Sequence, residues 1–257
     1  MELKSLFDLK DKNVLVTGGS QGIGKAIAKG MAEFGANVII HYNSNHSKAI
    51  ETLDELNSLG NKTGSIAANL TETGSEETIY EYCVSAFGHI DILVLNASIQ
   101  FRKDWQKISN EEFEQQINAN FRSSLFLIQK FVPPMRDKNW GRVIIIGSVQ
   151  QRRPHAAMTV YSATKSALEN VVISLAPDLA KNQITINNVA PGAILTGRNE
   201  KVLSDNDYHQ LVINKIPLGW VGNPVDCAGI CVLLASDAGK YITGENIYVD
   251  GGMGLAT

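Results

Sequence analysis

The sequence has little cysteine, no long apolar run and no marked excess of charge of either sign. Its three cysteines, Cys83, Cys227 and Cys231, are too few and too unevenly spaced for a disulfide framework. No stretch approaches the roughly 20 apolar residues that a membrane helix requires, and residues 1–13 alternate charges without a signal-peptide core. The formal net charge of −3 gives no reason to expect nucleic acid or an anionic membrane as a partner. We therefore expect a cytoplasmic protein with neither partner.

Clusters of metal ligands are also missing from the sequence. Cys227 and Cys231 share a helical face at i and i+4 but have no histidine nearby, so we expect them to pack as small apolar residues rather than to bind a metal. The five histidines are scattered along the chain: His41, His46, His89, His155 and His209. We expect no metal cofactor.

Apolar runs alternate with longer amphipathic stretches along the whole chain. Hydrophobic residues make up 44% of the 257, enough for a sizeable core. Continuous apolar runs predict buried strands at 13–17, 37–42, 91–96, 142–148, 184–192 and 246–252, with a weaker strand at 62–69. The stretches between them predict helices at 22–34, 48–59, 76–87, 111–135 and 159–181.

This βαβ alternation predicts one α/β domain over residues 1–257. Its core is a doubly wound parallel (Rossmann) sheet of about seven strands, with helices on both faces. Residues 193–217 show no clear pattern and are long enough to form a substrate lid.

The first predicted strand runs directly into TGGSQGIG, residues 17–24. Glycines at 18, 22 and 24 permit a tight turn, after which the N–H groups at the start of a helix face an anion. The turn follows a strand, opens a helix and begins a βαβ unit, which is the context that indicates dinucleotide binding. A plain strand–helix connector is the alternative.

Residues 160–165, VYSATK, place a tyrosine four residues before a lysine. Positions i and i+4 share a helical face, so Tyr161 and Lys165 can project into one cleft. A free phenol has a pKa of about 10, and a lysine cation about 5 Å away favours its ionised form, as general acid–base catalysis requires. Ser148 ends a predicted strand, and its hydroxyl can come near the phenol. The alternatives are a surface Tyr–Lys pair and a helix-capping serine.

Several motifs, in the same order, resemble those of the short-chain dehydrogenase/reductase family over nearly the whole chain. They are TGGSQGIG (17–24), LNAS (95–98), Asn120, Ser148, YSATK (161–165), PGAILT (191–196) and the stretch 217–252. The resemblance implies an enzyme that moves a hydride between a nicotinamide cofactor and a carbonyl or secondary alcohol. It implies that Ser148 hydrogen-bonds the substrate oxygen and that Tyr161 transfers the proton. Lys165 would also hold the nicotinamide ribose, and Asn120 would anchor a water behind that lysine.

The resemblance also implies a set of cofactor contacts. These are Gly18, Ser20, Gln21, Gly22, Ile23, Gly24, Tyr42, Asn43, Ser44, Asn69, Leu70, Asn96, Ala97, Ser98, Tyr161, Lys165, Pro191, Gly192, Ile194 and Thr196. Two of them depart from the family pattern. Ser98 stands where a glycine is usual and must take the backbone angle that the glycine supplies. Asn69 stands where an aspartate commonly faces the adenine, and its oxygen can still accept a hydrogen bond from an adenine amino group.

The end of the second predicted strand favours NADP over NAD. Enzymes of this fold that prefer NAD carry a carboxylate there to bind the ribose 2′-hydroxyl, whereas this chain has Tyr42, Asn43 and Ser44. His46 and Lys48 follow closely and can add positive charge. Because Gln21 stands where many NADP enzymes carry an arginine, we expect a modest NADP(H) preference with usable NAD(H) activity.

The substrate is less well defined by the sequence. Gln150, Arg152, Arg153 and His155 could offer hydrogen bonds or charge to a polar or anionic substrate such as a keto-sugar acid, although the arginines could equally be solvated or lie at a subunit contact. The expected substrate contacts are Ser148, Gln150, Arg153 and Tyr161.

The carboxyl third resembles sugar and polyol dehydrogenases and also 3-oxoacyl carrier-protein reductases. We favour a small polar ketone or sugar-type substrate and keep the carrier-protein reductase as an alternative. A catalytically silent dinucleotide-sensing regulator is the alternative from another class. The resemblance further implies a homotetramer with helices 111–135 and 159–181 at one contact, the second helix containing Pro177.

Overall fold

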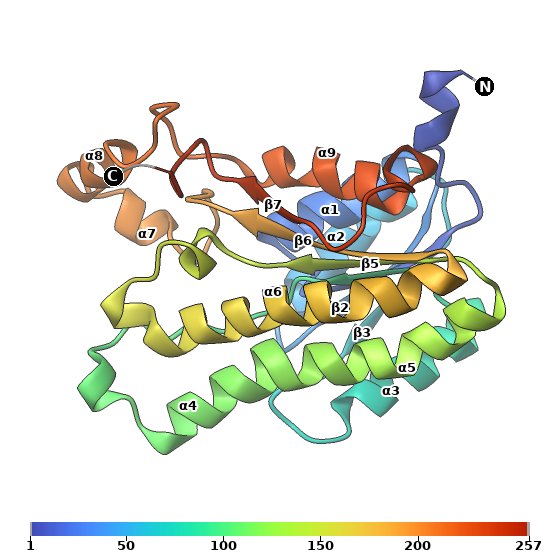
Figure 1. Cartoon of the computed structure of the whole chain (residues 1–257), viewed down its shortest axis with the longest axis horizontal. Helices are drawn as coiled ribbons and strands as arrows, with labels where there is room; N and C mark the ends of the chain where they lie inside the picture. Colours follow the sequence, from blue (N-terminus) through green and yellow to red (C-terminus); the bar gives the residue numbers. More distant parts are fainter. Residues whose placement is uncertain (1, 256–257) are drawn as a thin grey trace.

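The computed structural model describes residues 2–255, and within them seven parallel strands form one sheet in the order β3-β2-β1-β4-β5-β6-β7 (Figure 1). The strands are β1 Asn13–Thr17, β2 Asn37–Tyr42, β3 Thr63–Ala67, β4 Ile92–Leu95, β5 Gly141–Ile146, β6 Ile184–Pro191 and β7 Asn246–Val249. The central strands β1, β4, β5 and β6 are buried along their whole length, as continuous apolar runs predict. The doubly wound parallel sheet is thus confirmed.

Helices cover both faces of the sheet (Figure 1). They are α1 Gly22–Glu33, α2 His46–Asn57, α3 Ser75–Phe87, α4 Asn110–Gln116, α5 Ser123–Asp137, α6 Thr159–Leu179, α7 Glu200–Leu203, α8 Asn206–Ile213 and α9 Pro224–Ala235. Buried residues of α1, α2 and α9 form one core with the sheet, and those of α3, α5 and α6 form the other. None of these helices is long and apolar enough to cross a membrane, within the part of the chain described.

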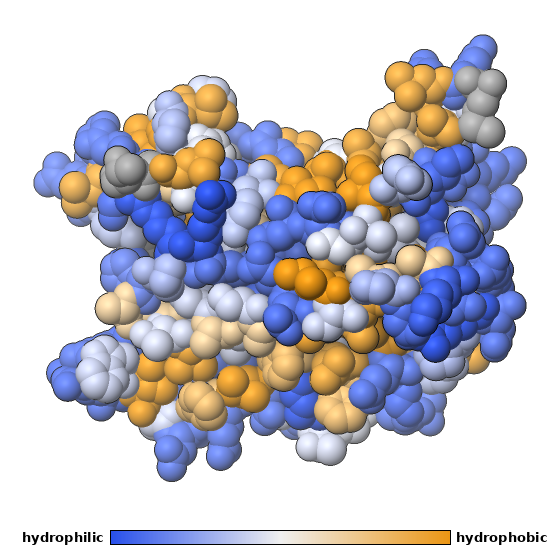
Figure 2. Space-filling view, viewed as in Figure 1, coloured by the Kyte–Doolittle hydropathy of each residue, from blue (hydrophilic) through white to orange (hydrophobic). Residues whose placement is uncertain are grey.

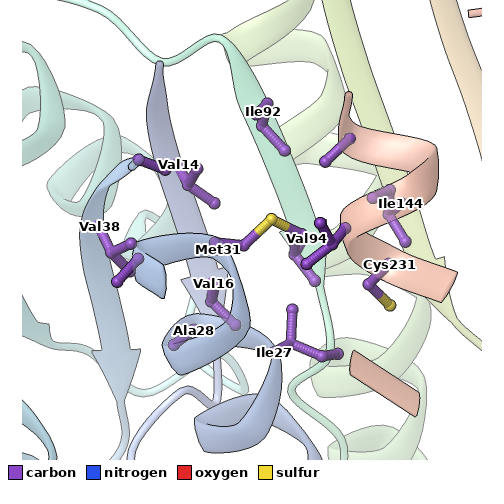
Figure 3. Packing of buried hydrophobic residues seen from close by; sticks show 14 of the residues in the cluster. Val14, Val16, Ile27, Ala28, Met31, Val38, Ile92, Val94, Ile144 and Cys231 are labelled. Carbon is purple, nitrogen blue, oxygen red and sulfur yellow. The ribbon is translucent and has the colours of Figure 1, made fainter. Parts of the chain in front are cut away.

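The core under α1 and α9 is built from small and branched apolar side chains (Figure 3). Met31 of α1 and Cys231 of α9 both pack against the sheet, where they meet strand residues such as Val16 and Val94. Cys231 is fully buried, and Cys227 one turn earlier is fully buried too. Both cysteines therefore pack as the small apolar residues we expected. Within residues 2–255 no group of three or more His, Cys, Asp or Glu side chains is arranged to hold a metal.

The predicted helix 111–135 is wrong in one respect, because a π-helical turn, Ile117–Arg122, separates α4 from α5. A π-turn holds one residue more than an α-turn, and such turns are frequent at functional sites. Ser123 and Ser124 follow it, and each hydroxyl donates to the carbonyl four residues earlier, Ala119 O at 2.8 Å and Asn120 O at 2.9 Å. The predicted helix 159–181 matches α6, which runs through Pro177.

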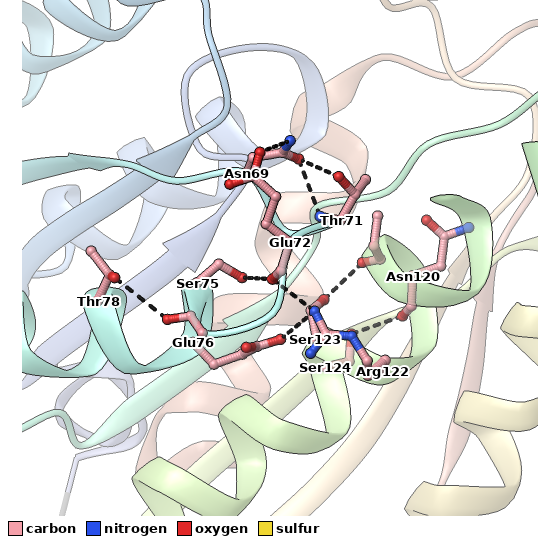
Figure 4. A network of polar contacts seen from close by, with 12 residues as sticks. Asn69, Thr71, Glu72, Ser75, Glu76, Thr78, Asn120, Arg122, Ser123 and Ser124 are labelled. Carbon is pink, nitrogen blue, oxygen red and sulfur yellow. Dashed lines mark hydrogen bonds and ion pairs between the residues drawn. The ribbon is translucent and has the colours of Figure 1, made fainter. Parts of the chain in front are cut away.

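The π-turn is tied to the segment that follows β3 (Figure 4). Arg122 donates to Glu72 O at 2.8 Å and forms an ion pair with the buried Glu76 at 3.1 Å. In the same segment Asn69 binds Thr71 and Glu72 through its side chain. The contacts of Arg122 therefore join the π-turn to the loop between β3 and α3.

Residues 193–217 are more ordered than their lack of sequence pattern suggested. They contain the two short helices α7 and α8, and Asp205 caps α8 by accepting a hydrogen bond from Tyr208 N at 2.9 Å. Short helices are stabilised mainly by tertiary contacts, so local periodicity predicts them poorly.

Candidate active site

A cavity of about 780 Å³ opens at the carboxyl edge of the sheet. The residues just beyond β1, β2, β4, β5 and β6 all line it: Gly18, Asn43, Asn96, Gly147 and Gly192. β1 and β4 are neighbours, and the chain leaves β1 toward β2 but leaves β4 toward β5 on the other side, which opens a crevice between them. In doubly wound sheets this crevice is where ligands bind.

The glycine turn leaves backbone N–H groups facing this cavity. Gly18 and Gly22 adopt positive φ angles of 63° and 56°, which other residues rarely adopt. A Cβ on Gly24 would lie 2.2 Å from Gly18 O, so the start of α1 can approach the turn only because it has none. Gln21, at the N-cap of α1, makes no side-chain cap. The first N–H groups of this helix therefore remain available to an anion.

The side chains of Asn96 and His41 hydrogen-bond to the backbone of the glycine turn. Asn96 Nδ2 donates to Thr17 O at 2.9 Å and to Gly18 O at 3.0 Å. His41, at the end of β2, is 2% exposed, and its Nδ1 accepts from Gly18 N–H at 3.2 Å. Because a backbone N–H can only donate, the ring proton must sit on Nε2, which then donates to Ala68 O at 2.9 Å. Burial lowers the pKa of His41 to about 4, so the ring is neutral in this role.

The structure brings Ser148, Tyr161 and Lys165 into the wall of the same cavity. All three are buried, and Lys165 Nζ donates to Ile146 O at 2.7 Å and lies 5.6 Å from the centroid of the Tyr161 ring. The i, i+4 spacing on α6 thus points both groups to one side, as predicted. The lysine is not the permanent cation we assumed: burial, and then the charge of Arg198, lowers the pKa of Lys165 to about 7.

Asn120 supports this wall without lining the cavity. Its side-chain oxygen accepts from Ile99 N at 2.8 Å, and its amide donates to Ile99 O at 3.0 Å and to Thr164 Oγ1 at 3.2 Å. Thr164 lies beside Lys165 on α6. Asn120 therefore joins the loop after β4 to the helix that carries the tyrosine and the lysine.

The far end of the cavity, beyond β2, carries no carboxylate within the described chain. Tyr42 OH lies 2.7 Å from His46 Nδ1, and Lys48 Nζ donates to Gln21 Oε1 at 2.9 Å. Asn69 lines the cavity too, but its oxygen accepts two hydrogen bonds from Thr71, at 3.1 and 2.9 Å. The oxygen that we expected to serve adenine is thus engaged within the chain.

Every residue expected to contact the cofactor lines this one cavity, as does Gln150. Arg153 does not line it, and its guanidinium donates instead to Met253 O at 2.9 Å. Ser98 needs no glycine-like angle, because the non-glycine residues with positive φ in the described chain are Asp11, Asn139 and Gln183.

Several residues that line the cavity were not predicted from the sequence, among them Arg102, Arg198, Tyr208 and His41. One signal was available for the two arginines. They lie in the loops after β4 and β6, and the carboxyl ends of parallel strands meet at the same edge. Tyr208 offered no such signal, because its place depends on the fold of residues 193–217.

Comparison with known proteins gives consistent matches over nearly the whole chain. The family model described as enoyl-(acyl carrier protein) reductase matches residues 18–254. An L-rhamnose 1-dehydrogenase (NADP(+)) of Thermoplasma acidophilum is 35% identical over 249 residues, 96% of this chain and 98% of that protein. A 3-oxoacyl-(acyl-carrier-protein) reductase of Staphylococcus aureus is 36% identical over 242 residues, 94% of this chain and 98% of that protein.

The similarity extends to solved structures. A 3-oxoacyl (acyl-carrier-protein) reductase from Agrobacterium tumefaciens, crystallised with NADP bound, superposes with a TM-score of 0.93 at 34% identity. The match covers 98% of this chain and 97% of that one.

Proposed function

The chain belongs to the short-chain dehydrogenase/reductase family, and we propose that it is an NADP(H)-preferring oxidoreductase of a small polar ketone or sugar-type alcohol. One observation carries the proposal. Ser148, Tyr161 and Lys165 line the same cavity as the glycine turn at the start of α1, whose first N–H groups have no side-chain cap. A proton-transfer group and a dinucleotide cradle therefore share one space.

The residues present fit a phosphorylated dinucleotide. The glycine turn would bind the pyrophosphate, and Lys165 would bind the nicotinamide ribose. No carboxylate lines the described cavity to repel a 2′-phosphate near Tyr42, and Lys48 stands close to Gln21. The T. acidophilum relative is named as an NADP(+) enzyme, and the A. tumefaciens structure contains NADP, which supports the same preference.

The nicotinamide, when bound, supplies the hydride in reduction and accepts it in oxidation. Ser148 donates a hydrogen bond to the substrate oxygen and orients it toward Tyr161. Tyr161 delivers its hydroxyl proton to that oxygen in reduction and takes it back in oxidation. Lys165, anchored to Ile146 O, places its ammonium near the phenol, where it stabilises the negative charge that forms on the phenol oxygen.

Three further features belong to this proposal. Residues 193–217 act as the substrate lid, because Ile194, Thr196 and Tyr208 line the cavity from that segment.

The subunits assemble as a homotetramer through α4, α5 and α6. Apolar surface gathers on the side of those helices (Figure 2), where Phe113, Phe126 and Ile173 are 48%, 42% and 55% exposed. A cytoplasmic location accords with three buried cysteines that are all free thiols.

A substrate panel tests the proposal. The protein is mixed with NADPH or NADH and with small polar ketones, ketoses and 3-oxoacyl thioesters, and kcat/KM is measured for each. Polar ketones are expected to give the highest values with NADPH. Preference for the thioesters would favour the carrier-protein reductase instead. Nucleotide binding without turnover of any compound would favour the dinucleotide-sensing regulator.

A variant pair tests the role of the phenol. Tyr161→Phe removes the proton donor with little change in volume and is expected to lower the single-turnover rate by about 10²-fold or more. NADPH affinity should stay within about twofold of the parent. Tyr241→Phe, at a fully exposed phenol, is the matched control and should change neither. A Tyr161→Phe rate within a few-fold of the parent would refute the catalytic assignment.

A further inference from the structure

Basic side chains but no acidic ones line the cavity in the described chain. The lining includes Arg102, Lys165 and Arg198 but no aspartate or glutamate. Lys165 lies beside Tyr161 on α6, whereas Arg102 comes from the loop after β4 and Arg198 from the loop after β6. Positive groups in a concave site with apolar walls concentrate anions there.

The two arginines reach toward each other's segment. Arg198 Nη2 donates to Ser98 O at 2.6 Å and contacts Ser98 Oγ at 3.4 Å. Arg102 Nη1 donates to the hydroxyl of Tyr208 on α8 at 2.8 Å. Each guanidinium therefore bonds to the segment that carries the other arginine. Together they join residues 98–102 to residues 198–208 at the cavity.

Neither guanidinium is neutralised within the described chain. Arg122, Arg136 and Arg142 each form an ion pair with a carboxylate, Glu76, Asp178 and Asp237 respectively. Across residues 2–255, no ion pair includes Arg102 or Arg198, whose acceptors are a phenol, a carbonyl and a hydroxyl. A guanidinium has five N–H donors in a planar fork, and these contacts use one nitrogen of each arginine. The remaining donors suit a carboxylate.

The arginines belong to the catalytic end of the cavity. Arg198 bonds to Ser98, and the loop that carries Ser98 and Arg102 bonds in turn to residues just before α6, through Lys103 N to Ala157 O at 2.9 Å and Gln100 Nε2 to Met158 Sδ at 2.7 Å. Met158, Leu203, Val212 and Met253 add apolar surface to the cavity lining. Both arginines are exposed, so their remaining N–H donors are accessible to an anion from solvent.

We infer that Arg102 and Arg198 form an anion subsite for the substrate, and that the carbonyl compound reduced at Tyr161 carries a carboxylate. This inference rests on the proposed function, since it describes the substrate of the same cavity. It transfers to these two residues the role that the sequence assigned to Arg153, which donates to Met253 O and does not itself line the cavity.

Binding of unreactive probes to the NADPH-loaded protein tests the subsite without requiring turnover. Hydroxy acids of three to six carbons, ending in D-gluconate, are compared with neutral polyols of the same lengths by calorimetry. At least one acid is expected to bind tenfold or more tightly than its polyol. Arg102→Gln and Arg198→Gln should each weaken that acid by tenfold or more while NADPH affinity stays within twofold. Arg198→Lys should restore part of the loss.

Arg136→Gln is the matched control, because it removes the same charge from an exposed position on α5 that pairs with Asp178. It should leave acid binding unchanged. Acids that bind no better than polyols, or that do not bind at all, would overturn the subsite. So would arginine variants that weaken NADPH as much as the acid, since that result assigns the arginines to the cofactor.

Different results would refute the catalytic assignment of Tyr161 and the anion subsite. Tyr161→Phe should bind the acid as the parent does while losing turnover. If charge discrimination is absent but Tyr161→Phe still abolishes turnover, the subsite is refuted and the oxidoreductase stands. If Tyr161→Phe keeps turnover, the catalytic assignment is refuted whatever the arginines do.

Discussion

Acid should destabilise this protein through one buried histidine at the glycine turn. His41 has a pKa of about 4 in the folded chain, against an ordinary value of 6.5, because burial disfavours its charged form. Protonation would also turn Nδ1 into a donor facing Gly18 N–H. The folded-state pKa is lowered, so the unfolded chain binds more protons between these two values. The stabilisation is present above pH 6.5 and is lost as the pH falls toward 4.

The size of this effect follows from the two pKa values. The linkage relation gives a loss of about 2 kcal/mol between pH 7 and pH 5 from this group alone. His41→Gln removes the titration while keeping one acceptor and one donor. The assay is urea unfolding of parent and variant at pH 7, 6 and 5, at one protein concentration. The parent should lose about 2 kcal/mol more than His41→Gln over this range. Parallel profiles would refute the reasoning, whatever the absolute stability of the variant.

Three further predictions concern the cofactor. Gly24→Ala should weaken NADPH binding by tenfold or more in a fluorescence titration, because the new Cβ would collide with Gly18 O. Gly229→Ala is the control: a Cβ there would meet open space, so this variant should bind NADPH as the parent does. Apparent NADPH affinity of the parent should fall as the pH rises from 6 to 9, because Lys165, with a pKa of about 7, loses its charge; an equally steep fall in Lys165→Met would contradict this. Tyr42→Asp should lower the ratio of kcat/KM for NADPH to that for NADH by tenfold or more, and a parent that itself favours NADH by tenfold would show the cofactor assignment to be wrong.

Most of the fold was predictable because its signals are local. The buried strands read as continuous apolar runs, and β1 and β2 begin and end where the sequence placed them. The π-turn at Ile117–Arg122 was not predictable, since one extra residue in a turn leaves the helical pattern on either side intact. Helices α7 and α8 also escaped prediction, because they are short and depend on contacts such as that of Tyr208 with Arg102.

By itself, the sequence determined the parallel sheet, the glycine turn and the shared face of Tyr161 and Lys165. These depend on strand and helix periodicity and on the missing Cβ of glycine, which act over a few residues. Only the tertiary structure decided that His41 accepts from Gly18, and that Arg198 meets Ser98 from 100 residues away. Such contacts depend on how separate loops come together at the edge of the sheet. Local periodicity does not predict which side chains of two distant loops bond to each other, so the contacts of Arg102 and Arg198 were recognised only in the folded chain.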